Sequence, residues 1–162
     1  MTQTNTRGEV GMDALELIRN DHETFRSLLG RLDETTERGV KTRTEVFLRL
    51  KREIVSHEKM EEEIFYPELR AARKPAEDIV LEGYEEHHVA DGIVEELGAL
   101  PPDDETWGAK LSVLKESLEH HMEEEEGEMF THARKAFKKA ELEELGIRMA
   151  ELKKTALESL AA

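Results

Sequence analysis

The sequence predicts an all-α protein: an up-down four-helix bundle with one additional helix at the C-terminus. Three observations support this fold class. Apolar residues recur at intervals of three and four along five segments, which is the period of an amphipathic helix. Only four of the 162 residues are proline, so long helices are rarely interrupted. Charged and hydrophobic residues each make up 38% of the chain, a balance that suits helices with one wet face.

Composition excludes several classes of function. The formal net charge is −15, from 38 acidic and 23 basic residues, and such a surface repels the phosphates of nucleic acid. The lack of cysteine rules out disulfides, iron–sulfur clusters and thiolate chemistry, and it suits a reducing cytoplasm. No apolar run approaches the roughly 20 residues of a membrane span, and the N-terminus lacks a signal-peptide stretch. We therefore expect a cytoplasmic protein that binds neither nucleic acid nor membrane.

The length of the chain fits one domain. We expect residues 1–11 to be a disordered N-terminal lead, residues 12–138 to form the bundle, and residues 139–162 to form an amphipathic helix packed on it. This last segment contains no histidine, so we expect it on the outside or end of the bundle, or against a second copy. The expected oligomeric state is a monomer or a weak homodimer.

The first two helices are expected to form an antiparallel pair. The first begins at an Asp13 cap and ends near Arg38–Gly39, where glycine suits the C-terminal position. The second begins at Thr42 or Thr44 and continues to Ala72. A short connection between them follows from these boundaries.

Counting from that connection predicts which residues face each other. His22 lies 16 residues before Arg38, and His57 lies 16 residues after Lys41. In an antiparallel pair, equal distances from the turn place both side chains at one height, about 24 Å along the helices. The two histidines are therefore expected to meet.

The remaining elements follow from proline positions and apolar spacing. Lys74–Pro75 breaks the chain, and a third helix is expected over Ala76–Leu97. Pro101–Asp104 forms a turn and supplies N-caps. The fourth helix is expected over Glu105–Lys138 and the last over Glu141–Leu160.

One pattern occurs twice. His57 precedes Glu61 by four residues in the second helix, and His121 precedes Glu125 by four residues in the fourth. Residues four apart lie on one face of a helix, so each pair can reach toward one point. The same faces carry apolar residues, so both pairs are expected to point into the core: Leu50, Ile54 and Ile64 in the second helix, and Leu111, Leu114, Leu118 and Met129 in the fourth.

Each of the four bundle helices carries one histidine on its apolar face. A buried imidazole or carboxylate needs a partner, and a metal ion serves both. Mixed imidazole and carboxylate donors suit Fe, Mn or Zn. The neighbours His88 and His120 face away from the apolar stripes and are weaker candidates. The candidate metal ligands are His22, His57, Glu61, His87, His121 and Glu125.

Rival motifs with similar spacing do not fit. A zinc-protease H-E-x-x-H motif would need histidine where Glu61 stands. The ferritin-like pattern needs Glu-x-x-His on two helices, and only Glu85-x-x-His88 fits. A plain acidic bundle would bury two carboxylates among four imidazoles, and breaking one buried charged pair costs about 3–5 kcal/mol. A metal-binding or sensing module and a redox enzyme both stay open.

The sequence resembles the hemerythrin-like, or HHE, cation-binding domains. The resemblance rests on Asp21–His22, on His57-x3-Glu61 followed by Phe65-Tyr66-Pro67, on Glu86–His87 and on His121-x3-Glu125, within about Asp13 to Lys138. It implies two iron ions with carboxylate and oxo or hydroxo bridges, with Mn or Zn less expected. By this resemblance His22 and His57 would serve one iron, His87 and His121 the other, and Glu61 and Glu125 would bridge them.

The family also suggests what the centre reacts with. Its members bind oxygen, sense oxygen, iron or nitric oxide, or decompose peroxide. Oxygen carriers place a second histidine four residues after the third-helix histidine, where this chain has Asp91. Asp91 is therefore a possible ligand or a hydrogen-bond partner of a ligand, and an anionic donor there favours the ferric state. We expect reaction with hydrogen peroxide (catalase-like) or dioxygen, and alternatively iron, oxygen or nitric oxide sensing without turnover.

Overall fold

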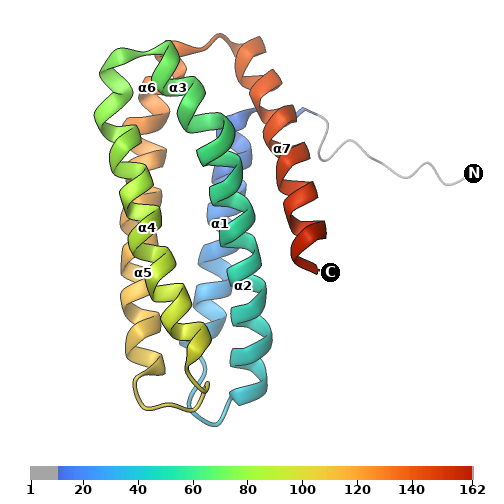
Figure 1. Cartoon of the computed structure of the whole chain (residues 1–162), viewed down its shortest axis with the longest axis vertical. Coiled ribbons are helices and arrows are strands. Elements are labelled where there is room, and N and C mark those ends of the chain that lie inside the picture. The colour runs from blue at the N-terminus through green and yellow to red at the C-terminus, as the bar shows by residue number, and fades with distance from the viewer. Residues whose placement is uncertain (1–10, 162) are drawn as a thin grey trace, which may run out of the picture.

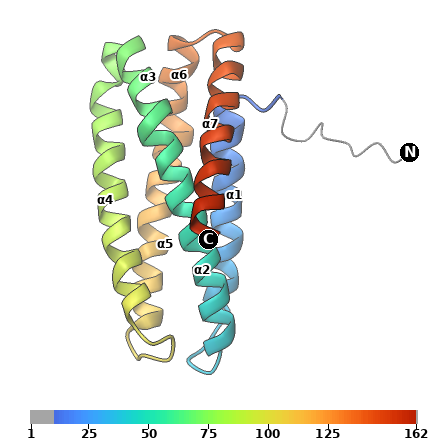
Figure 2. The same cartoon turned by 45° about the vertical axis from the view of Figure 1, so that its right-hand side comes forward.

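The computed structural model describes residues 11–161, which form a bundle of long helices (Figures 1 and 2). No strand occurs among these residues. The predicted all-α, up-down four-helix bundle with an extra C-terminal helix is confirmed. The long helices are α1 (Ala14–Asp33), α2 (Val40–Met60), α4 (Glu77–Ala99), α5 (Trp107–Glu124) and α7 (Lys139–Ala161). Shorter elements are the π-helix η2 (Glu61–Phe65), α3 (Tyr66–Ala72), the 3-10 helix η3 (Lys74–Ala76), the π-helix η4 (Glu125–Met129) and α6 (Phe130–Ala136).

Helix α1 begins as expected and ends earlier than expected. The Asp13 side chain accepts from the Glu16 amide while the Glu16 side chain accepts from the Asp13 amide, which is a capping box. The prediction of an end near Arg38–Gly39 is wrong, because the amide and hydroxyl of Thr35 both donate to the Leu32 carbonyl and close the last turn. Gly39 has φ −83° and precedes α2, which therefore starts at Val40.

The second and fourth bundle helices each contain a π-helical turn that the sequence did not predict. Helices α2, η2 and α3 run on from one another to Ala72, and α5, η4 and α6 run on to Ala136. The π turns begin at Glu61 and at Glu125, the glutamates of the repeated motif. Single π turns inside α-helices are frequent at functional sites.

The connections explain the remaining boundaries. Helix α4 follows a 3-10 turn around Pro75. Before α5, the Asp104 side chain accepts from the amide and the hydroxyl of Thr106, so the aspartate caps the turn as expected and the helix itself begins at Trp107. The lead predicted over residues 1–11 lies, apart from Gly11, outside the described residues. Among residues 11–161, no helix combines the length and apolar character needed to cross a bilayer.

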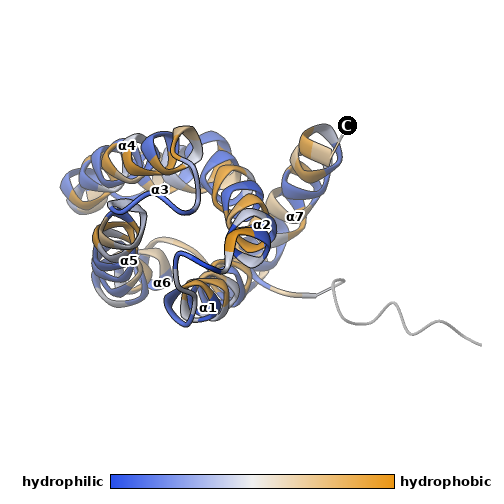
Figure 3. Cartoon of the chain, turned by 90° about the horizontal axis from the view of Figure 1, so that it is seen from below, coloured by the Kyte–Doolittle hydropathy of each residue, from blue (hydrophilic) through white to orange (hydrophobic). Residues whose placement is uncertain are grey.

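Helix α7 lies on the outside of the bundle. It packs along α1 and α2, and the view along the bundle shows it beside α2, outside the ring of the main helices (Figure 3). Its buried residues are Leu142, Leu145, Gly146, Met149 and Ala156.

The core consists of two apolar clusters with a polar layer between them. One cluster surrounds Phe65 and Phe130 near the α3–α6 end of the bundle. The other surrounds Phe25 and Trp107 toward the opposite end. On each bundle helix a buried histidine lies at the boundary between the two clusters, as His57 does between Ile54 and Met60. The apolar clusters therefore hold the polar layer away from solvent on both sides.

Replacing Gly146 with alanine is expected to destabilise the fold. A Cβ atom there would meet the Met12 carbonyl oxygen and the Asp13 and Ala14 backbone, so α7 would have to move away from α1. Overpacking of this kind typically costs about 1–3 kcal/mol. Gly92→Ala is the control, because nothing lies within 4 Å of a Cβ at Gly92 and a helical alanine gains about 0.5–1 kcal/mol over glycine. Thermal melts of both variants check this, and equal melting temperatures would contradict the tight α1–α7 contact.

Candidate metal centre

The polar layer contains all six candidate ligands, each on the element where the sequence placed it. His22 comes from α1 and His87 from α4. The repeated motif supplies the rest, with each histidine at the end of an α-helix and each glutamate opening the π turn that follows. Every one of these side chains is buried, with residue exposures between 0% and 5%: His22, His57, Glu61, His87, His121 and Glu125.

The donors form two groups that share a carboxylate. In the first, ligand atoms of His22, His57, Glu61 and Glu125 lie within 4.8 Å of one another. In the second, ligand atoms of Glu61, His87 and His121 satisfy the same limit. The ring centroids of His22 and His57 are 5.3 Å apart, so the two face each other at one height although the turn between α1 and α2 lies elsewhere than expected.

Both glutamates lie between the two histidine pairs. Glu125 Oε1 is 3.1 Å from Nε2 of His22 and 3.1 Å from Nε2 of His121. Glu61 Oε1 lies beside Nε2 of His57, and its Oε2 is 3.8 Å from Nε2 of His87. Each carboxylate thus reaches from the α1–α2 side of the layer to the α4–α5 side.

Each histidine turns its other ring nitrogen toward a carboxylate of a neighbouring helix. At hydrogen-bond distance, which His22, His57 and His121 reach, such a partner holds Nδ1 protonated and leaves the Nε2 lone pair free to bind a metal ion. Part of this arrangement is visible in the sequence, because Asp21 and Glu86 directly precede the candidate ligands His22 and His87. Each carboxylate, however, contacts the histidine of a neighbouring helix. The Nδ1 to oxygen distances are His57–Asp21 2.8 Å, His22–Glu126 3.0 Å, His121–Glu86 3.0 Å and His87–Glu62 3.8 Å.

Several donor atoms in the layer lack partners. Nε2 of His57 and both carboxylate oxygens of Glu61 are buried and make no hydrogen bond within residues 11–161, although Nε2 and Oε1 of this pair lie beside each other. A buried polar atom without a partner costs about 1–3 kcal/mol. A metal ion accepts imidazole and carboxylate donors together, so the residues present fit a metal centre.

The buried charges of the layer shift one another's pKa values. Burial and the nearby Glu125 charge raise the pKa of Glu61 well above its ordinary value. For Glu125 burial acts in the same direction, but the His121 charge and hydrogen bonds to the carboxylate outweigh it and hold the pKa well below its ordinary value. Burial opposes the charge on His121, yet the Glu125 charge prevails and raises the His121 pKa well above its ordinary value. In the layer, the charged forms of Glu125 and His121 therefore stabilise each other, while burial and the Glu125 charge favour the protonated form of Glu61.

Tyr66 completes the layer and was not among the predicted ligands. Its hydroxyl donates to Glu125 Oε2 at 2.7 Å and lies 3.3 Å from Nε2 of His87, whose ring stacks on the tyrosine at 5.4 Å between centroids. Gly83 makes room for this ring, because a Cβ there would lie 2.9 Å from the Tyr66 hydroxyl oxygen. The Phe65-Tyr66-Pro67 sequence was the available signal for Tyr66.

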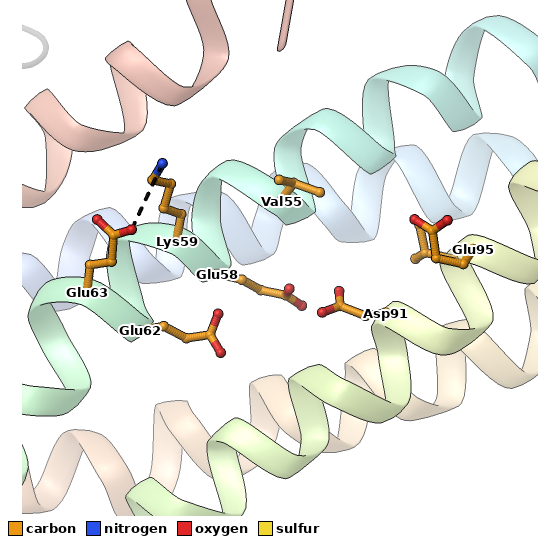
Figure 4. A pocket seen from close by; sticks show the side chains of 8 residues that line it. Val55, Glu58, Lys59, Glu62, Glu63, Asp91 and Glu95 are labelled. Carbon is orange, nitrogen blue, oxygen red and sulfur yellow. Dashed lines mark ion pairs between the residues drawn. The ribbon is translucent and has the colours of Figure 1, made fainter. Parts of the chain in front are cut away.

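Asp91 is not brought to the buried groups. It is exposed and belongs to neither group of donors among the described residues. Four residues turn an α-helix by about 400°, so Asp91 is rotated about 40° from His87, toward α2, while Ala90 and Val94 continue the buried face. There Asp91 faces Glu58 (Figure 4), and burial together with the Asp91 hydrogen bond and charge raises the pKa of Glu58 to about 10.

The other histidines lie outside the layer. His88 is exposed. The His120 side chain is 62% exposed and pairs with Glu86 and Glu124 at 3.2 Å. His132 accepts a hydrogen bond from Arg73.

Helix α7 contributes one residue to the surroundings of the layer. Lys153 pairs with Asp21 Oδ1, and it lies 3.3 Å from Glu53. Asp21 is the carboxylate that holds His57, so the C-terminal helix is connected to a candidate ligand through Asp21. The sequence gave no sign of this contact.

Comparisons with known proteins agree with this arrangement. Residues 13–133 match the family model described as Hemerythrin HHE cation binding domain. The solved structure of a hemerythrin HHE cation binding domain-containing protein from Mycobacterium kansasii is similar, with a TM-score of 0.80 and 26% sequence identity. That similarity covers 91% of this chain and 89% of the other. The search of curated proteins gave no match.

Proposed function

The chain belongs to the hemerythrin HHE cation-binding domain family, and from this premise we propose that its buried layer holds two iron ions that react with hydrogen peroxide. The observation that carries the proposal is the orientation of the four histidines. All four direct Nε2 toward the two shared glutamates and Nδ1 toward an outer carboxylate. That is the arrangement expected of imidazoles prepared to bind metal.

The two groups of donors support a proposal for the ligands of each ion. His22 and His57 would hold one ion, His87 and His121 the other, and Glu61 and Glu125 would be shared between them. Bound iron would supply the electron transfer that peroxide or dioxygen chemistry requires. Mn and Zn accept similar donors, and metal analysis distinguishes them.

The residues around the donors define what the site can do. Tyr66 orients Glu125 through its 2.7 Å hydrogen bond and presents its hydroxyl 3.3 Å from Nε2 of His87. Phe25 packs edge-on against the His57 ring at 5.1 Å, which keeps bulk water from that side of the layer. A dry site of this kind takes a small, uncharged reactant, which describes hydrogen peroxide, dioxygen and nitric oxide.

Peroxide decomposition is favoured over reversible oxygen carriage by the donor set. The layer offers two imidazoles on each side, Glu61 in both groups of donors, and Glu125 at 3.1 Å from both His22 and His121, so each ion would have two imidazoles and could share both carboxylates. Oxygen carriers have a further histidine at the position of Asp91, which is exposed here, so among the described residues the α4–α5 side of the layer has no third imidazole. Carboxylates shared by the two ions would favour the ferric state over the ferrous state. The lack of a further donor from the described residues on the α4–α5 side would leave a coordination position for peroxide.

The test measures peroxide consumption by iron-loaded protein. We expect oxygen release from hydrogen peroxide well above that of free iron, and its loss in His57→Ala. Equal rates for protein and free iron, together with reversible spectral changes on cycling dioxygen or nitric oxide, would replace the enzymatic proposal with the sensing module.

Replacing Lys153 with methionine is expected to weaken metal binding without removing any ligand. Lys153 pairs with Asp21, which in turn holds His57, and losing such outer partners typically costs about 10–100-fold in metal affinity. Competition with a chelator gives the affinity. Lys154→Met is the matched control. Lys154 is exposed, and its replacement removes the same charge from the same helix. Equal affinities for the two variants would show that α7 does not influence the centre.

A further inference from the structure

A second set of metal-type donors lies on the outer side of the buried layer. Ligand atoms of Glu58, Glu62 and His87 lie within 4.8 Å of one another. Two of the three, Glu58 and Glu62, border a cavity of about 580 Å³ between α2–η2 and α4 (Figure 4). The carboxylates that line this cavity belong to Glu58, Glu62, Glu63, Asp91 and Glu95.

Among the residues that the structure describes, two of the five carboxylates in this cavity have a lysine partner and three do not. Glu63 is 3.9 Å from Lys59, and Glu95 is 3.4 Å from Lys51. The other three carboxylates have no lysine or arginine within ion-pair distance among residues 11–161. Two of them, Glu58 and Asp91, point at each other across the cavity (Figure 4), although Glu58 is 94% buried. Glu58 shares a hydrogen bond with Asp91 across the cavity, and a cation bound by oxygens of both residues would take the place of the shared proton.

His87 supplies an independent sign of a ligand. Its Nδ1 is buried and has no hydrogen-bond partner within the described part of the chain. The nearest carboxylate oxygen is that of Glu62 at 3.8 Å, beyond hydrogen-bond distance. The other three layer histidines hold their Nδ1 partners at 2.8–3.0 Å. Among the four, and within residues 11–161, His87 thus keeps an unpaired Nδ1 near Glu58 and Glu62, two of the carboxylates that border the outer cavity.

We propose that Glu58, Glu62 and Asp91, with Nδ1 of His87, form an outer site for a divalent cation such as Mn²⁺ or Fe²⁺, from which the buried centre is loaded. Oxygen donors with one imidazole suit these ions. The loading role rests on the proposed function above, whereas binding at the outer site does not.

The chemistry of His87 explains how one residue can serve both sites. A neutral imidazole has one free lone pair, so His87 binds outward through Nδ1 or inward through Nε2, and not both. When Nε2 binds inward, the ring proton moves to Nδ1, where Glu62 is the nearest acceptor. The outer site then loses its nitrogen donor, so filling the buried position weakens the outer one.

The test titrates metal-free full-length protein with Mn²⁺ and counts bound ions from the electron paramagnetic resonance signal of free Mn²⁺. The double variant Glu62→Gln, Asp91→Asn is compared with Glu63→Gln, Glu95→Gln, which removes the same charge from the same cavity. We expect the first variant to lose one weakly bound Mn²⁺ per chain and to take up Fe²⁺ about tenfold more slowly. The second variant should match the parent in both measurements.

The outcomes separate the two proposals. Equal Mn²⁺ counts and equal uptake rates in the two double variants would overturn the outer site. If the first double variant binds one Mn²⁺ fewer than the second, but the iron-loaded parent consumes no peroxide, the outer site is supported and the enzymatic proposal is wrong. Circular dichroism of each variant confirms folding, and the single variant Glu62→Gln, at a partly exposed side chain, repeats the test if the double variant does not fold.

Discussion

Protein in which His57 is replaced by alanine is expected to bind one metal ion or none, in place of the two that we propose for the parent. His57 is buried, its Nε2 lacks a hydrogen-bond partner among residues 11–161, and its Nδ1 is fixed by Asp21 at 2.8 Å. Removing the imidazole leaves a cavity between His22 and Glu61 and no nitrogen donor to replace it. His121→Ala should have the same effect on the α4–α5 side, where Glu125 Oε1 is 3.1 Å from Nε2.

Three other histidines provide matched controls. His88→Ala, His120→Ala and His132→Ala remove the same side chain from positions outside the buried layer, and all three should keep full metal content. Metal analysis of purified variants decides the matter. Full retention of metal in His57→Ala, or equal loss in His120→Ala, would show that the buried layer is not the metal centre.

The positions of the candidate ligands could be predicted because two simple rules agreed. Residues four apart share a helix face, and apolar neighbours show which face points inward. These rules placed His57 and Glu61 in the core, and the structure brings them together with His22. The histidines meet although the end of α1 was misplaced, since burial of the apolar faces decides how α1 and α2 align.

The π turns could not be predicted from the same rules. A π turn contains one residue more than an α-helical turn. The apolar pattern around Glu61 and Glu125 fits the ordinary period of 3.6 residues, so it gives no sign of the extra residue. Pro67, which cannot donate a backbone hydrogen bond, is a signal near the first π turn. The second π turn has no proline at the matching position, Thr131.

Contacts between helices were the other feature beyond reach of the sequence. Asp21 precedes His22 in the chain but holds His57, and Lys153 reaches Asp21 from 132 positions away. The prediction that Asp91 points inward is wrong. Asp91 is rotated by about 40° from His87 around α4, and this rotation moves its side chain from the core to the exposed edge of the helix. Which neighbouring helix receives such an edge residue depends on packing, and no single-helix pattern contains that information.

Removing the metal is expected to lower the melting temperature substantially. The layer would keep buried carboxylates and imidazoles without their cation, including the unpartnered oxygens of Glu61. A ligand present at about 1,000 times its Kd stabilises the folded state by about 4 kcal/mol. For a chain of this size that corresponds to roughly 8–16 °C in melting temperature. Melts with and without chelator measure the difference, and identical midpoints would mean that folding and metal binding are independent.

The stability of the metal-free protein is also expected to fall as the pH rises from 7 to 10. The pKa of Glu58 is about 10 against an ordinary 4.5, and the pKa values of Glu61 and His121 are raised well above their ordinary 4.5 and 6.5. Folded protein then holds protons that the unfolded chain has released, so this stabilisation is complete below the ordinary values and is lost as the pH rises through the raised ones. A metal ion bound by Glu61 and His121 would compete with protons for these groups, so the metal-loaded protein should show a smaller slope. Glu58→Gln should reduce the slope of the metal-free protein, while Glu63→Gln, at an exposed side chain, should not. A melting temperature of the metal-free protein that rises with pH over this range would contradict the protonated layer.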